Sequence, residues 1–300
     1  MIITRINGGL GNQMFQYAAG RRLADNLGVE LKVDLNGMHQ LDGSPLEDIN
    51  KVHFYYRLKF MNIRAEIATN EDLRQFDKKE KGIFGKLKGY SGRLQKTKPG
   101  KRFMEGDFEF DPAVLELGDN TLLDGFWQSE KYFNDIADEL RNDFSFKLLP
   151  EGKNLELANQ IERTNAVFIL VRRGALVNDP KTSSVHGYCN LGFYTECANL
   201  MASKVKAPVF YVFSDEPEWA EQYLKLDYPC VYVGHNGREF YHDDLRLMSL
   251  CKHGISSNST WSWWGAWLIK NPEKIIMAPK KWFKASINTK DLIPENWVLI

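Results

Sequence analysis

INGGLGNQMFQYAAGRRLA, residues 6–24, is the stretch from which the fold of this 300-residue chain can be predicted. The short β-branched run at residues 2–6 predicts a first strand. Apolar residues after the glycines recur at helical spacing, and they predict a helix over residues 12–27 with Asn12 as its N-cap. Between strand and helix, three glycines give the backbone the freedom for a tight turn with close ligand approach: Gly8, Gly9 and Gly11.

This strand, turn and helix have the features of an anion site. Free backbone N–H groups and the positive end of the helix dipole meet at the first turn of a helix, where a phosphate can bind. The glycines match neither the GxGxxG pattern nor a P-loop, since no Lys-Ser or Lys-Thr pair follows them. An ordinary tight connection between strand and helix therefore stays open as the alternative interpretation.

Composition excludes several classes of protein. The 39 Lys and Arg residues balance the 39 Asp and Glu residues, so no bulk affinity for nucleic acid follows. The four cysteines form no CxxC pair and no Cys/His cluster with zinc spacing, which predicts reduced thiols in a cytosolic protein. Arg5 interrupts the first apolar run, so we expect no signal peptide.

Apolar strands that alternate with helices predict an α/β protein. The expected strands lie at residues 29–34, 102–106, 121–124, 166–171, 208–213, 230–233, 254–256 and 274–278. The expected helices lie at residues 71–77, 129–144, 155–163, 193–204, 218–224, 239–251 and 259–269. This pattern indicates parallel sheets covered on both faces, with ligands beyond the carboxyl ends of the strands. We expect two α/β halves, residues 1–150 and 151–300, with a boundary at residues 148–153 and a ligand in the cleft between them.

Residues 78–102 form a distinct basic segment of the first half. They contain ten Lys or Arg residues and a single acid, Glu80, with few apolar side chains. This composition is typical of a basic surface loop or insertion. Two interpretations stay open: a solvated surface segment, and a contact with an anionic glycan or a membrane surface. The second would make a cytoplasmic protein peripheral at the inner face of the membrane.

A pair of arginines, Arg172 and Arg173, directly follows the buried strand expected at residues 166–171. Each guanidinium is a planar donor fork that stays charged, so a pair at the carboxyl end of a strand is suited to clamp a diphosphate. Asp215 follows the next strand and should reach the same edge, where it could bond a ribose, a base or a sugar. The alternatives are a structural ion pair for the arginines and a helix N-cap for Asp215.

Two further segments of the second half carry groups that suit a nucleotide. Asp243 and Asp244 precede an apolar helical pattern, and one of them could accept two N–H bonds from a guanine edge. The alternative is an acid at a helix start. Residues 256–260, SSNST, place hydroxyls and backbone N–H groups at another helix start, which predicts a second anion site. Four tryptophans follow and are expected mostly in the core: Trp261, Trp263, Trp264 and Trp267.

Absent motifs narrow the chemistry. No DxD follows an apolar strand, so a metal-bridged diphosphate is not expected, and the chain has no GxSxG, HExxH or P-loop motif. The residues by themselves therefore predict a protein that binds a phosphate or diphosphate compound through arginines and helix starts. We expect no metal and no cofactor.

Five motifs occur in order along nearly the whole chain. They are GGLGNQMFQYAAGRRLA at residues 8–24, RRG at 172–174, FSDEPEW at 213–219, DDLRLMSLCKHGISSNSTWSWWGAWL at 243–268 and IIMAPKKWF at 275–283. Together they resemble glycosyltransferase family 11, the α-1,2-fucosyltransferases. The resemblance implies a GT-B-like fold of two Rossmann-like halves, GDP-fucose as the donor, inversion at the sugar and no metal requirement. It also implies a galactose-containing oligosaccharide or glycolipid as the acceptor, on the side of residues 1–150.

The resemblance further implies roles residue by residue. The first glycine turn, the arginine pair and the SSNST segment would contact the donor diphosphate, and Asp244 would read guanine. The donor-binding set predicted in this way is Gly9, Gly11, Asn12, Gln13, Arg172, Arg173, Asp244, Asn258, Ser259 and Thr260.

One departure concerns the family pattern HxRRxD. Residues 170–175 read LVRRGA, so Leu170 stands at the histidine position and Ala175 at the aspartate position. Neither side chain can supply a hydrogen bond or a charge. The expected fold and donor are unaffected, but three outcomes stay open: a fucosyltransferase, a GDP-sugar-binding protein without turnover, and a transferase of another sugar.

As an enzyme, the chain would transfer L-fucose to the 2-OH of a galactoside. The hydroxyl would attack C1 from the face opposite the diphosphate, while positive donors stabilise the leaving GDP. A general base should take the hydroxyl proton. Its identity stays open between Asp215 and Asp179, because position 175 holds alanine. Arg172 and Asp215 are the predicted catalytic residues.

Overall fold

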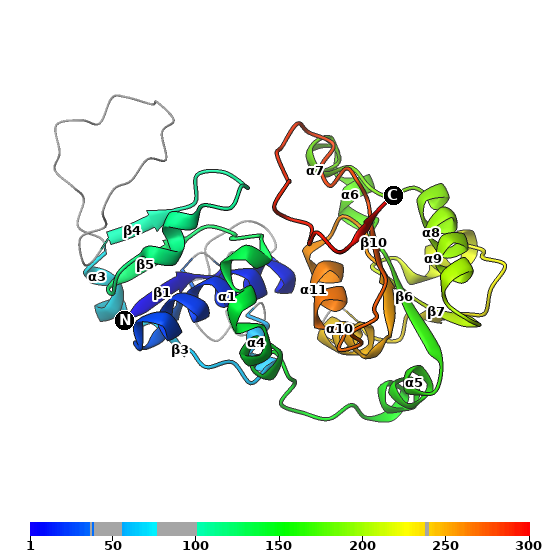
Figure 1. Ribbon diagram of the computed structural model, residues 1–300, viewed down its shortest axis with the longest axis horizontal. Helices are drawn as coiled ribbons and strands as arrows, with labels where there is room; N and C mark the ends of the chain where they lie inside the picture. The colour runs from blue at the N-terminus through cyan, green and yellow to red at the C-terminus, as the bar shows by residue number, and fades with distance from the viewer. Residues whose placement is uncertain (37, 39–55, 77–100, 238–239) are drawn as a thin grey trace. The chain divides into compact units, whose positions relative to one another are not determined.

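The computed structural model describes residues 1–36, 38, 56–76, 101–237 and 240–300, and they form two compact units (Figure 1). Unit 1 consists of Met1–Ser145 with Lys290–Leu292. Unit 2 consists of Phe146–Thr289 with Ile293–Ile300. The chain leaves unit 1 after Ser145, a few residues before the expected boundary.

Unit 1 is built on a sheet whose five described strands are all parallel, in the order β3-β2-β1-β5-β4. In chain order these strands are β1 Ile2–Arg5, β2 Leu31–Asp34, β3 Glu66–Ile67, β4 Lys101–Met104 and β5 Thr121–Asp124. β1 is central, with Ile2 opposite Leu31 on one side and Thr121 on the other. Its β-branched residues suit this position, because they pack well on a pleated surface buried from both sides.

Helix α1, Leu10–Leu27, packs along this sheet. It begins two residues earlier than predicted, and its N-cap is Gly9, so the prediction that Asn12 caps it is wrong. Gly20 brings the helix close to the strands, since a Cβ there would lie 3.0 Å from Leu31 Cδ1. A larger residue at position 20 would therefore push the helix away from the sheet.

The other helices of unit 1 are short. They are α3 Asn70–Arg74, α4 Ala137–Asp143 and 3-10 turns at Leu58–Phe60, Pro112–Glu116, Glu130–Tyr132 and Asn134–Ile136. The continuous helix predicted over residues 129–144 is wrong. Ser129 does cap a first turn, accepting from the Lys131 N–H at 3.3 Å, but Phe133 then leaves the helical region with φ −152° and is fully buried. Burying the Phe133 ring stabilises the fold more than continuing the helix through this residue would.

Unit 2 is built on six described strands, again all parallel, in the order β11-β10-β9-β6-β7-β8. They are β6 Asn165–Val171, β7 Pro208–Ser214, β8 Cys230–Val233, β9 His253–Ile255, β10 Ile276–Ala278 and β11 Val298–Leu299. The helices are α5 Gly152–Glu162, α6 Gly174–Asn178, α7 Pro180–His186, α8 Leu191–Lys204, α9 Pro217–Tyr223, α10 Tyr241–Leu250 and α11 Thr260–Leu268. The sequence did not predict three elements of unit 2: the helices α6 and α7 and the strand β11.

The core of unit 2 lies on both faces of β6, where Figure 1 shows α8 and α9 on one side and α10 and α11 on the other. Val167, Ile169 and Val171 alternate along β6 and pack in one cluster with Tyr194 and Cys197 of α8. This double coverage explains why the strand is continuously apolar. The prediction of two α/β units with parallel sheets is confirmed.

Some predictions fall outside this description. Of the basic segment at residues 78–102, only Lys101 and Arg102 are described, at the start of β4.

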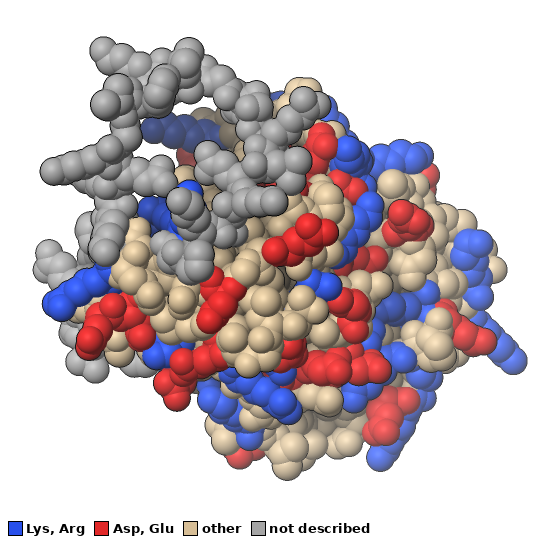
Figure 2. All heavy atoms as spheres, turned by 60° about the vertical axis from the view of Figure 1, so that its left-hand side comes forward, with Lys and Arg blue, Asp and Glu red and all other residues tan. Residues whose placement is uncertain are grey.

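In the described part of the chain, none of the helices has both the length and the apolar character needed to cross a bilayer. On the face shown in Figure 2, positive and negative side chains are interspersed, in agreement with the zero net charge.

Candidate functional site

The carboxyl ends of β6 and β7 bring the predicted catalytic residues together. The two strands run in register, with Val171 opposite Ser214, so the residues that follow them meet at the same edge. The Ser214 hydroxyl donates to the Val171 carbonyl oxygen at 2.9 Å and accepts the Glu216 N–H at 3.0 Å, which fixes the turn after β7. Arg172 and Asp215 therefore lie side by side, as the sequence predicts.

Asp215 organises this edge. Its Oδ2 accepts a charged hydrogen bond from Arg172 Nη1, and its Oδ1 accepts the Arg173 N–H at 2.9 Å. Gly174 leaves space for the carboxylate, because a Cβ at position 174 would overlap Asp215 Oδ2. The alternative that Asp215 caps the following helix is wrong, since Glu216 holds the N-cap position of α9.

Arg173 is held on two sides. Its Nε donates to Glu216 Oε2 at 3.0 Å, and its guanidinium carbon lies 4.1 Å from the centre of the Trp219 ring. The ion pair and the cation–π contact anchor α9 to the end of β6. Arg172 differs, because its Nε and Nη2 make no hydrogen bond to the described residues. Arg172 is thus oriented by Asp215 and keeps donors for a ligand.

The SSNST segment lies between β9 and α11. Ser259 is the N-cap of α11, and its Oγ accepts the Trp261 N–H at 3.3 Å, as predicted for a helix start. The Asn258 amide donates to the carbonyl oxygens of His186, Gly187 and Trp282 at 3.1, 3.3 and 3.2 Å, so this side chain holds the surrounding loops.

The rest of this segment has buried and helical positions. Thr260 is the first residue of α11. Ser257 is fully buried, and its hydroxyl has no hydrogen-bond partner among the described residues. Three of the four tryptophans lie in the core, as predicted: Trp263, Trp264 and Trp267.

Asp244 lies in the first turn of α10 and is almost completely buried. Its Oδ1 accepts from Asn236 Nδ2 at 2.7 Å. Asn236 and Asn154 exchange amide hydrogen bonds at 3.0 Å, and His235 Nε2 lies 2.7 Å from Asn154 Oδ1. Burial raises the pKa of Asp244 to about 7, against the lowering effect of the Asn236 hydrogen bond. A buried carboxylate held by one oxygen can offer the other to a ligand N–H.

The predicted donor-binding residues of the first glycine turn belong to unit 1. Gly8 has φ +71°, and a Cβ there would lie 2.6 Å from Asn12 Nδ2, so the turn requires glycine at this position. Gln13 is buried and serves the turn itself: its Nε2 donates to the Gly8 carbonyl oxygen at 2.9 Å. Asn12 Oδ1 accepts from Gln128 Nε2 at 3.2 Å. Gly9 is exposed, whereas Gly11 is buried at the start of α1, so of these two glycines only Gly9 has an accessible backbone.

Two positions singled out in the sequence have structural surroundings of their own. Leu170 is fully buried in β6, so in this chain position 170 belongs to the core. Asp179 is the N-cap of α7, with oxygens on the N–H groups of Lys181 and Thr182. The Thr182 hydroxyl donates to Asp179 as well, and this bond lowers the pKa of Asp179 most. Together with the N–H bonds it makes Asp179 a weaker base.

Several residues of the site were not found from the sequence. Glu216 and Trp219 hold Arg173, and Asn154 and Asn236 hold Asp244. The motif FSDEPEW contains the first two, but only the fold shows that they turn back onto Arg173. No comparable signal marks Asn154, which lies 90 residues before Asp244 and meets its neighbours through packing of α5 on α10. Among the described residues, no group of three or more His, Cys, Asp or Glu is placed to hold a metal ion.

Comparison with known proteins identifies the family of this chain. The model of the family described as glycosyl transferase family 11 matches residues 111–300. This chain belongs to glycosyltransferase family 11. It is 31% identical to an α-1,2-colitosyltransferase of Escherichia coli, over 100% of this chain and 99% of the relative. It is 26% identical to galactoside α-(1,2)-fucosyltransferase 1 of Saimiri boliviensis boliviensis, over 51% of this chain and 44% of that protein.

Among solved structures, this family 11 chain is similar to the NodZ α-1,6-fucosyltransferase soaked with GDP-fucose. The TM-score is 0.45 at 15% sequence identity, over 92% of this chain and 94% of NodZ. The range matched by the family model, residues 111–300, includes the arginine edge, the SSNST segment and Asp244.

Proposed function

We propose that this family 11 glycosyltransferase is an inverting, metal-independent α-1,2-transferase that moves L-fucose from GDP-fucose to the 2-OH of a galactoside. The observation that carries the proposal is the arginine edge of unit 2. There Arg172, oriented by Asp215, keeps guanidinium donors that no described residue uses. A guanidinium of this kind suits a diphosphate, which offers paired oxygens to a planar fork.

The buried carboxylate of Asp244 supports guanine as the base. Asn236 occupies one oxygen, and the other is able to accept an N–H from a guanine edge. The network of Asn154 and Asn236 holds the carboxylate without a counter-charge, so an ionised Asp244 would gain a partner when the base binds. Adenine has an acceptor where guanine has its N1–H, which favours guanine over adenine here.

In the proposed reaction, the acceptor 2-OH attacks C1 of the donor sugar and the C1–O bond to GDP breaks. The negative charge that develops on the diphosphate is stabilised by Arg172 and by the backbone N–H groups at the start of α11. The acceptor proton passes to a general base. Asp215 is already bonded to Arg172 and to the Arg173 N–H, so we assign it the orientation of Arg172 and leave the base unassigned.

The role of Asp215 also bears on the altered motif. An aspartate at position 175 could have oriented the arginines, and Asp215 fills that role here from the neighbouring strand. We therefore favour an active enzyme over a GDP-sugar-binding protein without turnover. The alternative of another sugar is favoured by one specific match: a relative that matches over the whole chain is named for colitose, whereas galactoside α-(1,2)-fucosyltransferase 1 matches over 51% of it.

The test combines binding and turnover. Calorimetry with GDP measures donor-site affinity, and GDP release is followed with lactose as acceptor and GDP-fucose or GDP-colitose as donor. We expect release with one of these 6-deoxy sugars, unchanged by EDTA, and an α-1,2 linkage in the product by NMR. Binding of GDP without release from either donor would leave the non-catalytic binding protein as the better interpretation. Release that requires Mg²⁺ or Mn²⁺ would contradict the metal-free mechanism.

A further inference from the structure

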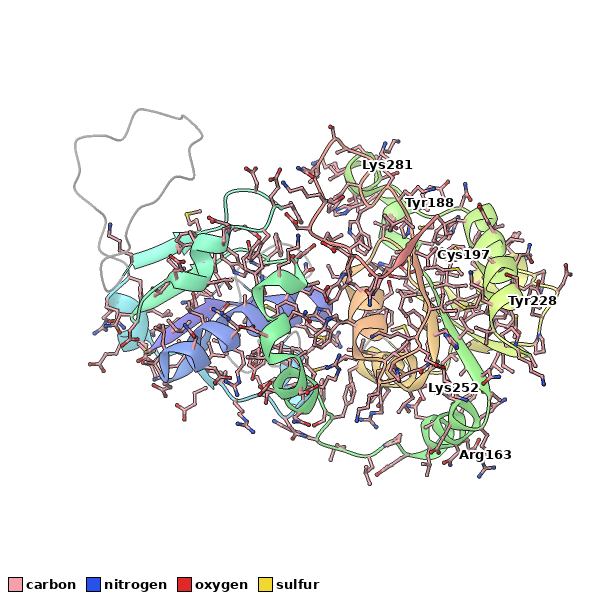
Figure 3. All side chains as sticks on the ribbon, in the orientation of Figure 1. Arg163, Tyr188, Cys197, Tyr228, Lys252 and Lys281 are labelled. Carbon is pink, nitrogen blue, oxygen red and sulfur yellow. The ribbon has the colours of Figure 1, made fainter. Side chains whose placement is uncertain are left out.

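Unit 2 contains a pocket that shares one residue, Asn258, with the set predicted to bind the donor. Its volume is about 470 Å³, and it lies between the end of α7 with the loop that follows and the segment after β10. We call it the lysine pocket. Its lining comprises Ser183, His186, Gly187, Tyr188, Cys189, Asn190, Phe193, Asn258, Pro279, Lys280, Lys281, Phe283, Lys284 and Ile300. In Figure 3, Tyr188 and Lys281 are labelled at this end of the unit.

The lysine pocket is positively charged. Lys280, Lys281 and Lys284 are exposed, and none of them forms an ion pair with a described residue through its side chain. No Asp or Glu side chain lines the pocket. Elsewhere in the described part of the chain, Lys32, Lys131 and Lys290 do pair with carboxylates, Lys32 with Asp72 at 3.0 Å. Three unpaired ammonium groups around one concavity raise the local concentration of anions.

Aromatic rings supply the other wall. The rings of His186 and Phe283 lie 5.2 Å apart at 50°, and Tyr188 is half-exposed beside them. Rings with an apolar body and a polar tip suit the faces and hydroxyls of a sugar. Lysines alone would suit any anion, whereas lysines with aromatic rings suit an anion carried on a saccharide.

The walls are held in place by the segment that starts α11. Asn258 donates its amide to carbonyl oxygens on both sides of the pocket, those of His186 and Trp282, at 3.1 and 3.2 Å. The Lys284 N–H also donates to the His186 carbonyl oxygen, at 3.2 Å. Gly187, at φ +65°, allows this approach, since a Cβ there would lie 3.2 Å from Lys284 Cβ. The pocket is therefore formed before a ligand binds.

The lysine pocket also adjoins the arginine edge. β9 pairs in parallel with β6 on one side and β10 on the other, so the segments after β6 and β10, which carry Arg172 and the three lysines, leave the same edge of the sheet. In agreement, burial and then the positive charge of Arg172 lower the pKa of His186. A ligand in the pocket would thus lie next to the group that we assign to the donor diphosphate. The diphosphate itself has Arg172 and the start of α11, so the three lysines are available to a second substrate.

We propose that the lysine pocket of unit 2, and not the side of residues 1–150 that the resemblance implies, binds the charged part of the acceptor. The pocket would select a saccharide carrying an anionic group, either a phosphate or a carboxylate. This inference rests on the proposed function, since it names the acceptor of that transferase. Lysine carries a compact charge on a flexible stem. It can therefore bind a phosphate or a carboxylate without the pair of parallel hydrogen bonds that an arginine makes.

The test compares acceptors that differ only in charge. Lactose 1-phosphate is paired with lactose, and lactobionate, which carries a carboxylate, is paired with lactitol. Binding is measured by calorimetry in the presence of GDP, and KM is measured with the active donor. We expect at least one anionic member to bind about tenfold or more tightly than its neutral partner, and this preference to shrink at high salt. The pair with the larger difference in affinity shows whether the pocket selects a phosphate or a carboxylate.

The double variant Lys281→Ala/Lys284→Ala should reduce the preference to within about twofold. Lys204→Ala, an exposed lysine at the end of α8, is the matched control and should keep the preference. Equal binding of anionic and neutral members, or a preference that survives the double variant, would overturn the proposal. Loss of GDP affinity in the double variant would assign the pocket to the donor instead. A preference in binding with no transfer from any donor would retain the pocket and reject the proposed reaction.

Discussion

Arg5 and Arg172 occupy matching places in the two units, each at the carboxyl end of a central parallel strand. In unit 1, Arg5 Nε donates to Asp34 Oδ2 at 2.8 Å and Nη1 donates to Asp124 Oδ2 at 3.0 Å. Its Nη2 also lies 2.8 Å from Asp34, whose side chain is completely buried. In unit 2, Arg172 gives one nitrogen to Asp215, and 35% of its side chain remains exposed.

The difference shows how a strand-end arginine is assigned to structure or to ligand binding. All three guanidinium nitrogens of Arg5 contact Asp34 or Asp124, so this side chain ties β1, β2 and β5 together and keeps fewer N–H groups for a ligand than Arg172. The guanidinium of Arg172 is oriented by one carboxylate and keeps donors facing solvent. Both arginines lie at a strand end. They differ in how many of their guanidinium N–H groups are already bonded within the protein.

The largest effect should follow from Arg5→Ala. This change leaves the buried Asp34 without its cation, and breaking such a pair costs about 3–5 kcal/mol of unfolding free energy. Denaturant unfolding measures the loss. Arg141→Ala, in an exposed pair with Asp138, is the control and should cost about 1 kcal/mol or less. Equal losses in the two variants would contradict the structural role of Arg5.

Arg172→Ala should do the opposite. We expect a loss of about 2–4 kcal/mol in GDP affinity, because charged hydrogen bonds to the diphosphate disappear from a half-buried site. Calorimetry with GDP measures this, and the unfolding free energy should change far less than in Arg5→Ala. GDP affinity within about twofold of the original protein would remove Arg172 from the donor site.

Asp215→Asn tests how Arg172 is oriented. The amide oxygen can still accept the Arg173 N–H, while the charged bond to Arg172 is lost, so KM for the donor should rise by about tenfold or more. Gly174→Ala should act in the same direction with a smaller effect, because its Cβ displaces the Asp215 carboxylate. A rise in KM without a matching fall in unfolding free energy is the signature of a positioning residue. Unchanged kinetics in both variants would show that Arg172 needs no such partner.

The pH dependence of GDP binding tests Asp244. Burial raises its pKa to about 7, and only the ionised carboxylate accepts a guanine N–H, so GDP affinity should fall as the pH drops below about 7. The limiting slope is about tenfold per pH unit for one proton. Asp244→Asn should bind GDP more weakly and remove this slope. His235→Gln is the control for the neighbouring imidazole, and a slope that disappears in this variant alone would assign the titration to His235.

The smallest change is expected from Ala175→Asp. If the aspartate of the family pattern serves to orient an arginine, Asp215 already does so here, and turnover should rise by less than about tenfold. A gain of about 10²-fold or more would mean that the missing carboxylate is the general base. The double change Leu170→His and Ala175→Asp adds a polar side chain at a position that is completely buried. We therefore expect this double variant to be less stable than Ala175→Asp, by thermal unfolding.

Local patterns determined much of this protein. The continuous apolar strands, the helix after the glycine turn and the Ser259 cap all follow from short-range chemistry, and the structure has them within a few residues of the predicted bounds. Arg172 and Asp215 were also predicted to share an edge, because adjacent parallel strands end together. The motifs by themselves were enough to indicate family 11.

Tertiary structure decided which of these groups are already in use. Two arginines at strand ends look alike in the sequence, and only packing shows that Arg5 is bonded to two aspartates while Arg172 is bonded to one. The lysine pocket, too, joins the end of α7 to the segment after β10, about 100 residues apart in the chain. The sequence fixes which donors and acceptors exist, but their partners depend on distances across the fold, and these arise only when the sheet and its helices pack.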